Sequence, residues 1–479
     1  MTISTQSQIA FGTDGWRAII AEEFTFENVR YCAKGVAQYL KAQGTAGQGV
    51  IVGYDTRFGS ERFAAAIAEV LAAEGVPSYL CQTWAPTPTV SYNVIALKAA
   101  GAIIVTASHN PPEWNGFKYK PDYGGSASPE IIAAVEREIH EAESAGPPSV
   151  MPLADALRDG IVTMIDPRPG YIDQLRSLVD VERIQAAGLR VVSDPMYGAG
   201  MGYLADLLGG GKTELIEIHG ERNPDFPGMR QPEPISHNLG ELREAVVRYG
   251  YGVGLATDGD ADRVGGVDEG GRFLTPLQFF ALLAFYLLEI RGERGPLVKS
   301  ITSSRMIDIL GEKYGVPVYE EPVGFKYVGP RMMETDALIG GEESGGFGFR
   351  GHVPERDGVL SALYILDAMA QTGRSLSGLI DWLYETVGPH QYDRLDLEFP
   401  AARRAEVMGS VAESQPAELA GVAVAEVSTK DGYHFMLDDG SWMLIRFSGT
   451  EPLLRIYAEA RSMERVQRLI GAGRDLTGI

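Results

Sequence analysis

Cysteine is scarce in this sequence: Cys32 and Cys81 are the only two among 479 residues, which excludes a disulfide framework. Both lie in apolar stretches, where we expect buried thiols in a reducing compartment. Long apolar runs are also missing, because the longest, Phe279–Leu288, is too short to cross a bilayer and instead predicts a buried helix. The first ten residues have neither a basic start nor an apolar core, so no signal peptide is expected. These absences favour a cytoplasmic protein without a membrane partner.

Basic side chains are in the minority, with 42 Lys and Arg against 64 Asp and Glu, which gives a net charge of -22. Such a negative chain argues against nucleic acids and anionic membranes as partners. If the substrate is a phosphate, its pocket must be basic against an acidic exterior. A chain of 479 residues also exceeds what one hydrophobic core usually supports, which predicts three or four domains.

Strand and helix patterns alternate over most of the chain. The expected strands lie at 49–54, 102–105, 189–192, 252–256, 296–298 and 337–339, and in the tail at 395–399, 421–427, 435–437 and 442–447. Ser60 is a candidate N-cap of one helix, Ser128-Pro129 opens another, and a Gly/Pro/Ser patch at 144–149 predicts a linker.

After about residue 388 the pattern changes to strands and one terminal helix, which is typical of an α+β fold. We therefore expect α/β domains at 1–150, 151–268 and 269–388, and an α+β domain at 389–479. Three polar loops directly follow expected strands, and ligands of open α/β sheets bind at the carboxyl ends of strands. Such domains facing one another would enclose a central cleft.

The first of these loops contains Ser108 between Ala107 and His109 and ends in Asn110-Pro111. A serine hydroxyl is a weak nucleophile and needs a base or a metal nearby. A simple turn would explain the same residues, since Asn-Pro is common in loops. No Gly-x-Ser-x-Gly elbow surrounds the serine, which argues against an α/β-hydrolase.

The second loop places Asp258, Asp260 and Asp262 at alternate positions. Three hard oxygen ligands suit Mg²⁺ or Ca²⁺ and not zinc. An EF-hand is a rival interpretation, with Glu269 at the twelfth position, but Arg263 stands where that loop requires glycine. A solvated acidic turn is another, although three adjacent carboxylates repel one another unless a cation lies among them. The pattern therefore favours a metal loop.

The third loop holds Glu342, Glu343 and Ser344 between glycines, a carboxylate and hydroxyl set that suits sugar hydroxyls, although a plain Gly-rich turn is equally compatible. A later segment offers a guanidinium, two hydroxyls and backbone N–H groups, which suits a phosphate monoester as well as an ordinary β-turn. Its residues are Arg446, Ser448, Gly449 and Thr450.

Two further cations lie near these loops in the sequence, Arg17 in Phe11–Arg17 and Lys118 ten residues after Ser108. Either could be a surface cation. A lysine held near a metal and several arginines can have its pKa lowered into a range useful for proton transfer, which we expect for Lys118.

Taken in order along the whole chain, these motifs closely resemble those of the α-D-phosphohexomutases of the phosphoglucomutase/phosphomannomutase type. The matching segments are Phe11–Gly15, Thr106–Pro111, Asp258–Arg263, Gly341–Gly345 and Ser448–Pro452. Five motifs in one order make the match highly specific. The resemblance implies three α/β domains with mixed sheets and a smaller α+β fourth domain around a central cleft.

The resemblance also implies roles for individual residues. Ser108 would be phosphorylated in the active enzyme, and its oxygen would join Asp258, Asp260 and Asp262 around one Mg²⁺ per chain. His109 and Lys118 would be candidates for acid–base work. Arg17 and Arg263 would support the phosphoryl group during transfer.

By the same resemblance, Glu342 and Ser344 would read the sugar hydroxyls, and Lys326 would be a further substrate-binding cation. The phosphate that does not react would be held by Arg446, Ser448, Gly449, Thr450 and Arg455. A mobile fourth domain, with a hinge near 388–393, would close the cleft against water.

The implied activity is that of an isomerase of carbohydrate metabolism that acts by intramolecular phosphotransfer. Gly324–Tyr327 and Gly351–Gly358 resemble the glucose branch, and Gly346 stands where mannose and glucosamine enzymes usually have histidine. We therefore expect a phosphoglucomutase that converts α-D-glucose 1-phosphate and glucose 6-phosphate through a hexose 1,6-bisphosphate, with glucose 1,6-bisphosphate as activator.

Several alternatives stay open beside this expectation. A phosphomannomutase or an enzyme of dual specificity would use the same site, since glucose and mannose differ only at C2. A metal-dependent sugar phosphatase would need no second phosphate site, and a Ca²⁺-binding scaffold would show no turnover. Small hexose phosphates are the expected partners, and the chain is expected to be a monomer or a homodimer.

Overall fold

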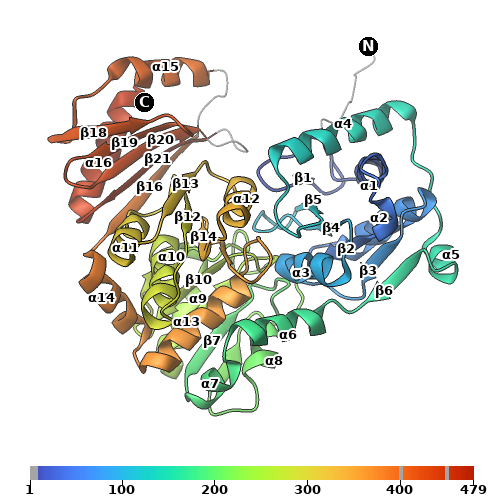
Figure 1. The fold of residues 1–479 in the computed structure, drawn as a ribbon, viewed down its shortest axis with the longest axis horizontal. Helices are drawn as coiled ribbons and strands as arrows, with labels where there is room; N and C mark the ends of the chain where they lie inside the picture. The colour runs from blue at the N-terminus through green and yellow to red at the C-terminus, as the bar shows by residue number, and fades with distance from the viewer. Residues whose placement is uncertain (1–8, 399–402, 448–452, 479) are drawn as a thin grey trace.

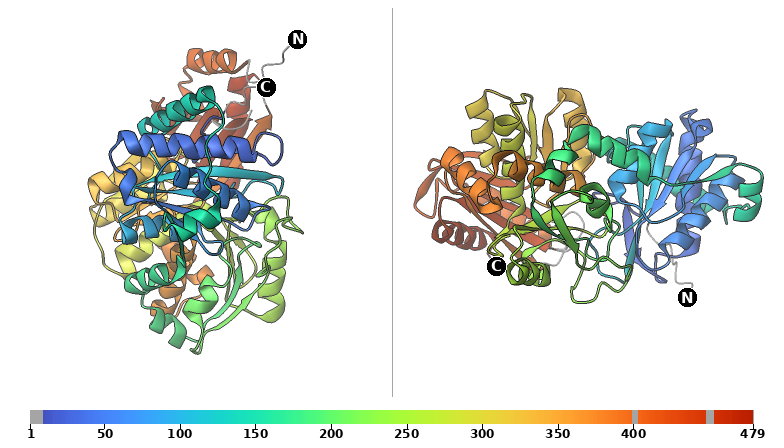
Figure 2. Two further views of the ribbon diagram at one scale, coloured as in Figure 1. Left: turned by 90° about the vertical axis from the view of Figure 1, so that its right-hand side faces the viewer. Right: turned by 90° about the horizontal axis from the view of Figure 1, so that it is seen from below.

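The computed structural model describes residues 9–398, 403–447 and 453–478, which form four sheets with helices packed on them (Figure 1). Each sheet, together with the helices packed on it, is called a unit and numbered in chain order. The first unit and the fourth lie at opposite ends of the molecule, with the second and third between them (Figure 2). The first three sheets are mixed and the fourth is antiparallel, which confirms the expected fold class.

The first sheet has the strand order β1-β5-β4-β2-β3-β6. Its strands are β1 (Trp16–Ile19), β2 (Val50–Tyr54), β3 (Ser78–Cys81), β4 (Gly101–Val105), β5 (Trp114–Pro121) and β6 (Val162–Ile165). Its helices are α1 (Phe26–Ala42), α2 (Ser60–Ala73), α3 (Thr87–Leu97), α4 (Pro129–Ala145) and α5 (Leu153–Arg158). The strands β4, β2, β3 and β6 run parallel, β5 pairs antiparallel with β4, and β1 pairs antiparallel with β5. The edge strand β6 carries this sheet past the boundary expected at residue 150.

The first turns of two helices in this unit test the N-caps predicted from the sequence at Ser60 and Ser128. Ser128 caps α4 as expected, with its side chain accepting from the Ile131 backbone N–H and Pro129 in the first turn. The N-cap expected at Ser60 is wrong, because the chain enters α2 through Gly59 at φ +72°. Ser60 is therefore already in the first turn, where its hydroxyl donates to Asp55 Oδ1 at 2.9 Å.

The second sheet has the order β11-β10-β9-β7-β8 and the third the order β13-β12-β14-β15. Their strands are β7 (Arg190–Asp194), β8 (Glu214–Glu217), β9 (Val253–Thr257), β10 (Val264–Asp268), β11 (Phe273–Leu274), β12 (Leu297–Ser300), β13 (Val318–Glu321), β14 (Ile339–Gly341) and β15 (Phe347–Phe349). Their helices are α6 (Arg168–Leu178), α7 (Val181–Ala186), α8 (Tyr203–Leu208), α9 (Gly240–Tyr249), α10 (Pro276–Phe285), α11 (Met306–Tyr314), α12 (Phe325–Thr335), α13 (Gly358–Thr372) and α14 (Leu376–Val387).

These two units share one continuous hydrophobic core. The helix expected at Phe279–Leu288 is found as α10, which Thr275 and Gln278 cap and which continues as a π-helical segment over Tyr286–Ile290. Both α10 and α13 are buried almost throughout and also contact β10 of the second sheet. The second and third sheets are therefore packed as one body.

The fourth sheet has the order β16-β21-β20-β19-β18-β17. Its elements are β16 (Gln391–Glu398), β17 (Glu418–Leu419), β18 (Val422–Ser428), β19 (Tyr433–Leu437), β20 (Trp442–Phe447), β21 (Leu453–Ala460), α15 (Arg404–Ser414) and α16 (Met463–Thr477). The helix α16 packs on β21, β16 and β20. Trp442, Leu444 and Tyr457 form an apolar cluster with Ile301 of the third unit, so the fourth unit is docked on the third.

Neither cysteine is poised for chemistry, since both Cys32 and Cys81 are buried free thiols. Burial raises the pKa of both thiol groups, that of Cys81 to about 12. Among the helices described, none combines the length and the apolar character needed to pass through a membrane.

Candidate active site

Ser108 lies three residues beyond the end of β4, at the carboxyl edge of the first sheet. Its φ of +52° is in the left-handed region, which a residue with a side chain adopts only when its surroundings hold it there. The Ser108 N–H donates to Thr106 Oγ1 at 2.8 Å. The serine side chain is thereby presented from a tight, fixed turn.

The turn is held by a buried arginine, Arg57, which was not predicted from the sequence as a site residue. Arg57 follows β2, the strand beside β4, and is fully buried. Its guanidinium donates to the carbonyls of Ser108 at 2.7 Å and Asn110 at 2.6 Å, and to those of Pro111 at 2.8 Å and Trp114 at 3.1 Å. Its position after a buried strand at the same sheet edge is the signal that could have identified it.

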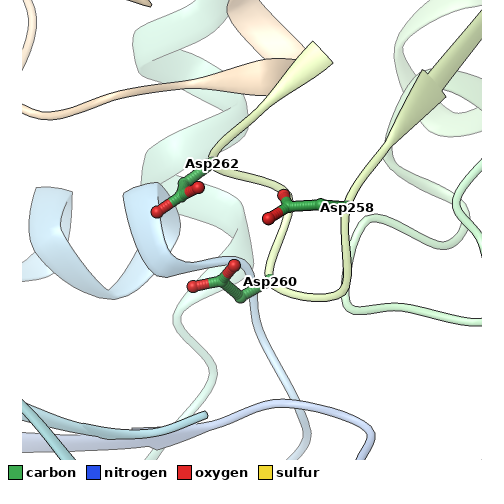
Figure 3. Close-up of side chains that lie close together, drawn as sticks. All are labelled: Asp258, Asp260 and Asp262. Carbon is green, nitrogen blue, oxygen red and sulfur yellow. The ribbon is translucent and has the colours of Figure 1, made fainter. Parts of the chain in front are cut away.

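The metal loop connects β9 to β10, and its three aspartate side chains lie close together (Figure 3). All three are buried. One carboxylate oxygen from each of Asp258, Asp260 and Asp262 lies within 4.8 Å of the others. Asp260 Oδ1 and Asp262 Oδ1 have no hydrogen-bond partner among the residues that the structure describes. Burial, and then the neighbouring aspartates, raises the pKa of Asp258 well above its ordinary value. Buried, mutually repelling carboxylates with unsatisfied oxygens fit a hard divalent cation such as Mg²⁺.

The serine loop and the metal loop meet directly, although they come from different units. Ser108 Oγ donates to Asp258 Oδ2 at 2.9 Å. His109 Nδ1 lies 3.2 Å from the same Oγ. Burial, together with the charges of Arg263 and Arg17, lowers the pKa of His109 well below its ordinary value, which favours the neutral imidazole.

Lys118 projects from β5 toward the aspartates of the metal loop and is almost completely buried. These residues and the serine loop are called the charged cluster below. Its Nζ lies 2.8 Å from Asp14, 2.8 Å from Asp260 and 3.3 Å from Asp262. Burial favours a lower pKa for this lysine, but the three carboxylates outweigh burial and raise it. The expectation of a lowered pKa is therefore wrong, because acidic groups and not arginines are its nearest neighbours.

Asp14 and Arg356 are two further members of the charged cluster to which the sequence analysis gave no role. Arg356 Nη2 donates to Asp14 at 2.5 Å and lies 2.9 Å from Asp262 Oδ2, so it joins the first, second and third units. Its side chain also covers Gly346, where an added Cβ would lie 2.3 Å from Arg356 Cδ. Both residues fall within segments that carry the family resemblance, which was the available signal.

The two predicted transfer arginines come from different units, Arg17 from β1 of the first and Arg263 from the metal loop of the second. Arg17 Nη1 donates to Asn110 Oδ1 of the serine loop at 2.8 Å. Arg263 Nε lies 3.9 Å from both Asp258 and Asp262, while its Nη1 donates to Glu233 at 3.0 Å. Positive charge thus surrounds the serine and the aspartates despite the acidic composition of the chain.

The loop with Glu342, Glu343 and Ser344, named the sugar loop from here on, connects β14 to β15. It lies beside the metal loop, since the Val264 N–H donates to the Gly345 carbonyl at 2.9 Å. Glu342 is buried and its Oε1 accepts from the Gly324 N–H at 2.8 Å. Ser344 Oγ is buried and has no hydrogen-bond partner within the described part of the chain. Lys326 lies in the first turn of α12 and is partly exposed, with its Nζ 5.5 Å from the Tyr327 ring.

The phosphate segment is described in part. Arg446 on β20 and Arg455 on β21 are directly opposite in the antiparallel register. Arg446 Nε donates to Asp431 at 2.9 Å, and Arg455 Nε lies 3.6 Å from Asp396. The predicted Ser448, Gly449 and Thr450 lie outside the described residues.

Comparison with known proteins agrees with this arrangement. The chain matches four domain models of phosphoglucomutase/phosphomannomutase: the α/β/α domains I, II and III over residues 8–146, 169–271 and 275–387, and the C-terminal domain over 404–474.

Relatives of similar length carry different substrate names. A "Phosphoglucomutase/phosphomannomutase" of Thermococcus kodakarensis is 34% identical over 463 residues, 97% of each chain. A "Probable phosphoglucosamine mutase" of Methanothermobacter thermautotrophicus is 32% identical over 463 residues, 95% of each chain. The crystal structure of a "putative phosphomannomutase" from Thermus thermophilus has a TM-score of 0.85 and 36% identity, and the match covers 98% of this chain and 99% of that one.

Proposed function

The chain belongs to the phosphoglucomutase/phosphomannomutase family, and from this premise we propose that it interconverts α-D-glucose 1-phosphate and glucose 6-phosphate through a phosphorylated Ser108. Family membership makes the chain an isomerase that acts on hexose phosphates. The main support for the role of Ser108 is the hydrogen bond from its Oγ to Asp258 Oδ2 at 2.9 Å, which joins a candidate nucleophile to a candidate metal loop.

In the proposed reaction, the bond between the Ser108 oxygen and phosphorus breaks as a free hydroxyl of the hexose monophosphate bonds to phosphorus. The hydroxyl proton passes to a base, and the released serine oxygen takes up a proton. A hexose 1,6-bisphosphate results, turns around in the cleft and returns its other phosphoryl group to Ser108. His109 and Lys118 are the acid–base candidates, since one contacts the serine oxygen and the other two of the aspartates.

The donor set of Asp258, Asp260, Asp262 and the Ser108 oxygen would hold Mg²⁺. When bound, the ion would offset most of the charge of the three carboxylates and would stabilise negative charge on the transferring group. The protein supplies the rest through Arg17, Arg263 and Lys118, which hold the phosphoryl group in line between its donor and acceptor oxygens.

Substrate recognition is assigned to the third and fourth units. We assign the sugar hydroxyls to Glu342 and Ser344, and the phosphate that does not react to Arg446 and Arg455 with the segment 448–450. Gly346 favours glucose, because mannose and glucosamine enzymes usually have histidine at this position, and here Arg356 fills the space that such a side chain would need. Phosphomannomutase activity is the second candidate, favoured by the double name of the Thermococcus kodakarensis relative.

A coupled assay tests the proposal by comparing glucose, mannose and glucosamine 1-phosphates, each with its 1,6-bisphosphate and Mg²⁺. We expect the highest kcat/KM for glucose 1-phosphate and no release of inorganic phosphate. Ser108→Ala should abolish turnover and remove the phosphate detected by intact mass. Full mutase activity of Ser108→Ala would exclude the phosphoserine route, and a preference for another sugar would exclude the glucose assignment alone.

A further inference from the structure

Asp431 connects the fourth unit to the third through a single carboxylate oxygen. Its Oδ2 accepts from Arg446 Nε at 2.9 Å and from the Val323 backbone N–H at 3.0 Å. The neighbouring Lys430 Nζ donates to the Glu320 carbonyl at 2.6 Å. Arg446 and Asp431 are both largely shielded from solvent, with side chains 11% and 25% exposed. A contact with so little water around it constrains both partners more than a surface ion pair does.

The turn that carries Asp431 is fitted closely to the arginine. Gly432 has φ +95°, and a Cβ added there would lie 2.4 Å from the Ile445 carbonyl oxygen and 3.1 Å from Arg446 Cβ. The turn can approach the backbone of β20 this closely only with glycine at position 432. The carboxylate is therefore placed against the arginine by the backbone itself.

The Asp431 Oδ2 oxygen is also connected to the sugar loop through the segment Val323–Gly324. Val323, which donates to Asp431, is followed by Gly324, whose N–H donates to Glu342 Oε1 at 2.8 Å. Two hydrogen bonds and one peptide unit thus connect the carboxylate beside Arg446 to the carboxylate of the sugar loop. None of these contacts involves Ser108 or the three aspartates of the metal loop.

We propose that Asp431 is a positioning residue of the phosphate site, which orients the Arg446 guanidinium and ties it to the segment that supports Glu342. The proposal rests on the proposed function, in which Arg446 binds the phosphate that does not react. A guanidinium held through Nε has its plane fixed, and its two Nη groups then point in one direction as a bidentate pair. Fixing that pair before the substrate arrives reduces the entropy lost on binding.

Kinetics of a double-mutant cycle test this role. We expect Asp431→Ala to raise KM for glucose 1-phosphate about tenfold with kcat changed by less than about threefold, because a single charged hydrogen bond is lost from a binding group. Asp431→Asn keeps an acceptor oxygen and should raise KM only about threefold. In an Arg446→Ala background, either Asp431 substitution should change KM no further, since the oriented group is gone.

Asp439→Ala is the matched control, because Asp439 lies in the β19–β20 turn at the other end of the same strands and pairs with Arg465 of α16. It should leave KM unchanged. If Asp431→Ala melts too early to assay, the Asp431→Asn cycle gives the answer. Additive effects of the Asp431 and Arg446 substitutions, or an unchanged KM in Asp431→Asn and Asp431→Ala, would overturn the inference. An Arg446→Ala enzyme with unchanged KM would instead refute the phosphate role in the proposed function.

Discussion

Replacing Arg57 by lysine removes the clamp under the serine loop while keeping its positive charge. The guanidinium donates to four loop carbonyls at 2.6–3.1 Å and lies 3.2 Å from Asp55. An ammonium group has three N–H donors at one point, so at least one of the four carbonyls loses its hydrogen bond, and the ion pair with Asp55 is lost as well. Each hydrogen bond from a charged donor contributes about 1.5–3 kcal/mol, so the interactions that hold the loop are weakened by at least about that amount.

We expect the loss to appear in kcat rather than in KM. A displacement of the reacting oxygen by about 1 Å costs on the order of 100-fold in rate, so Arg57→Lys should lower kcat about 100-fold. The proposed sugar and phosphate contacts lie in other units, so KM for glucose 1-phosphate should stay within about threefold of the wild-type value. Initial rates in the coupled assay, with a thermal melt of each protein, measure both effects.

Arg62→Lys is the control, because Arg62 is an exposed residue of α2 that contacts no part of the serine loop in the described structure. It should leave kcat, KM and the melting temperature unchanged. A fully active Arg57→Lys protein with an unchanged melting temperature would show that the loop keeps its geometry without the clamp.

Three further predictions concern other parts of the molecule. Asp258→Asn should lower Mg²⁺ affinity by at least about tenfold, measured by titration calorimetry, because a charged ligand becomes neutral; unchanged affinity would remove this carboxylate from the donor set. Burial, and then the nearby Lys299 and Arg305, lowers the pKa of His434 to about 3, so only the unfolded chain gains this proton as the pH falls from about 6.5 toward 3. Urea unfolding should thus show that His434→Phe loses about 2 kcal/mol less stability than the wild type between pH 7 and pH 5, and equal losses would contradict a buried neutral histidine. Gly346→Ala should lower the melting temperature through its clash with Arg356, and Arg356→Ala should relieve that clash; equal destabilisation in both backgrounds would show that the two side chains do not compete.

The sequence was a good guide wherever local pattern decides the outcome. Short buried strands predicted β4, β9 and β14, and the loops after them hold Ser108, the three aspartates and Glu342. Ser108 and Asp258 are 150 positions apart, yet the rule that loops gather at the carboxyl ends of strands brings them into contact.

The contacts of the remaining residues could not be predicted, because they depend on segments that meet only in the folded chain. The positions of Arg57, Asp14 and Arg356 carried a signal, but nothing local marks an arginine as the partner of four carbonyls. The pKa of Lys118 depends on which charges are nearest, which spacing along the chain does not give. The strand β21 was not predicted either, and β6 completes a sheet that the linker at 144–149 was expected to leave behind.

The common core of the second and third units limits how the enzyme can open. Besides that core, the Gly358 N–H donates to the Ala261 carbonyl at 3.0 Å and the Val264 N–H to the Gly345 carbonyl at 2.9 Å. The metal loop and the sugar loop therefore belong to one packed body, and we expect their separation to stay constant. In the proposed reaction, we expect substrate entry and the reversal of the bisphosphate to be accommodated by movement of the first and fourth units against this body.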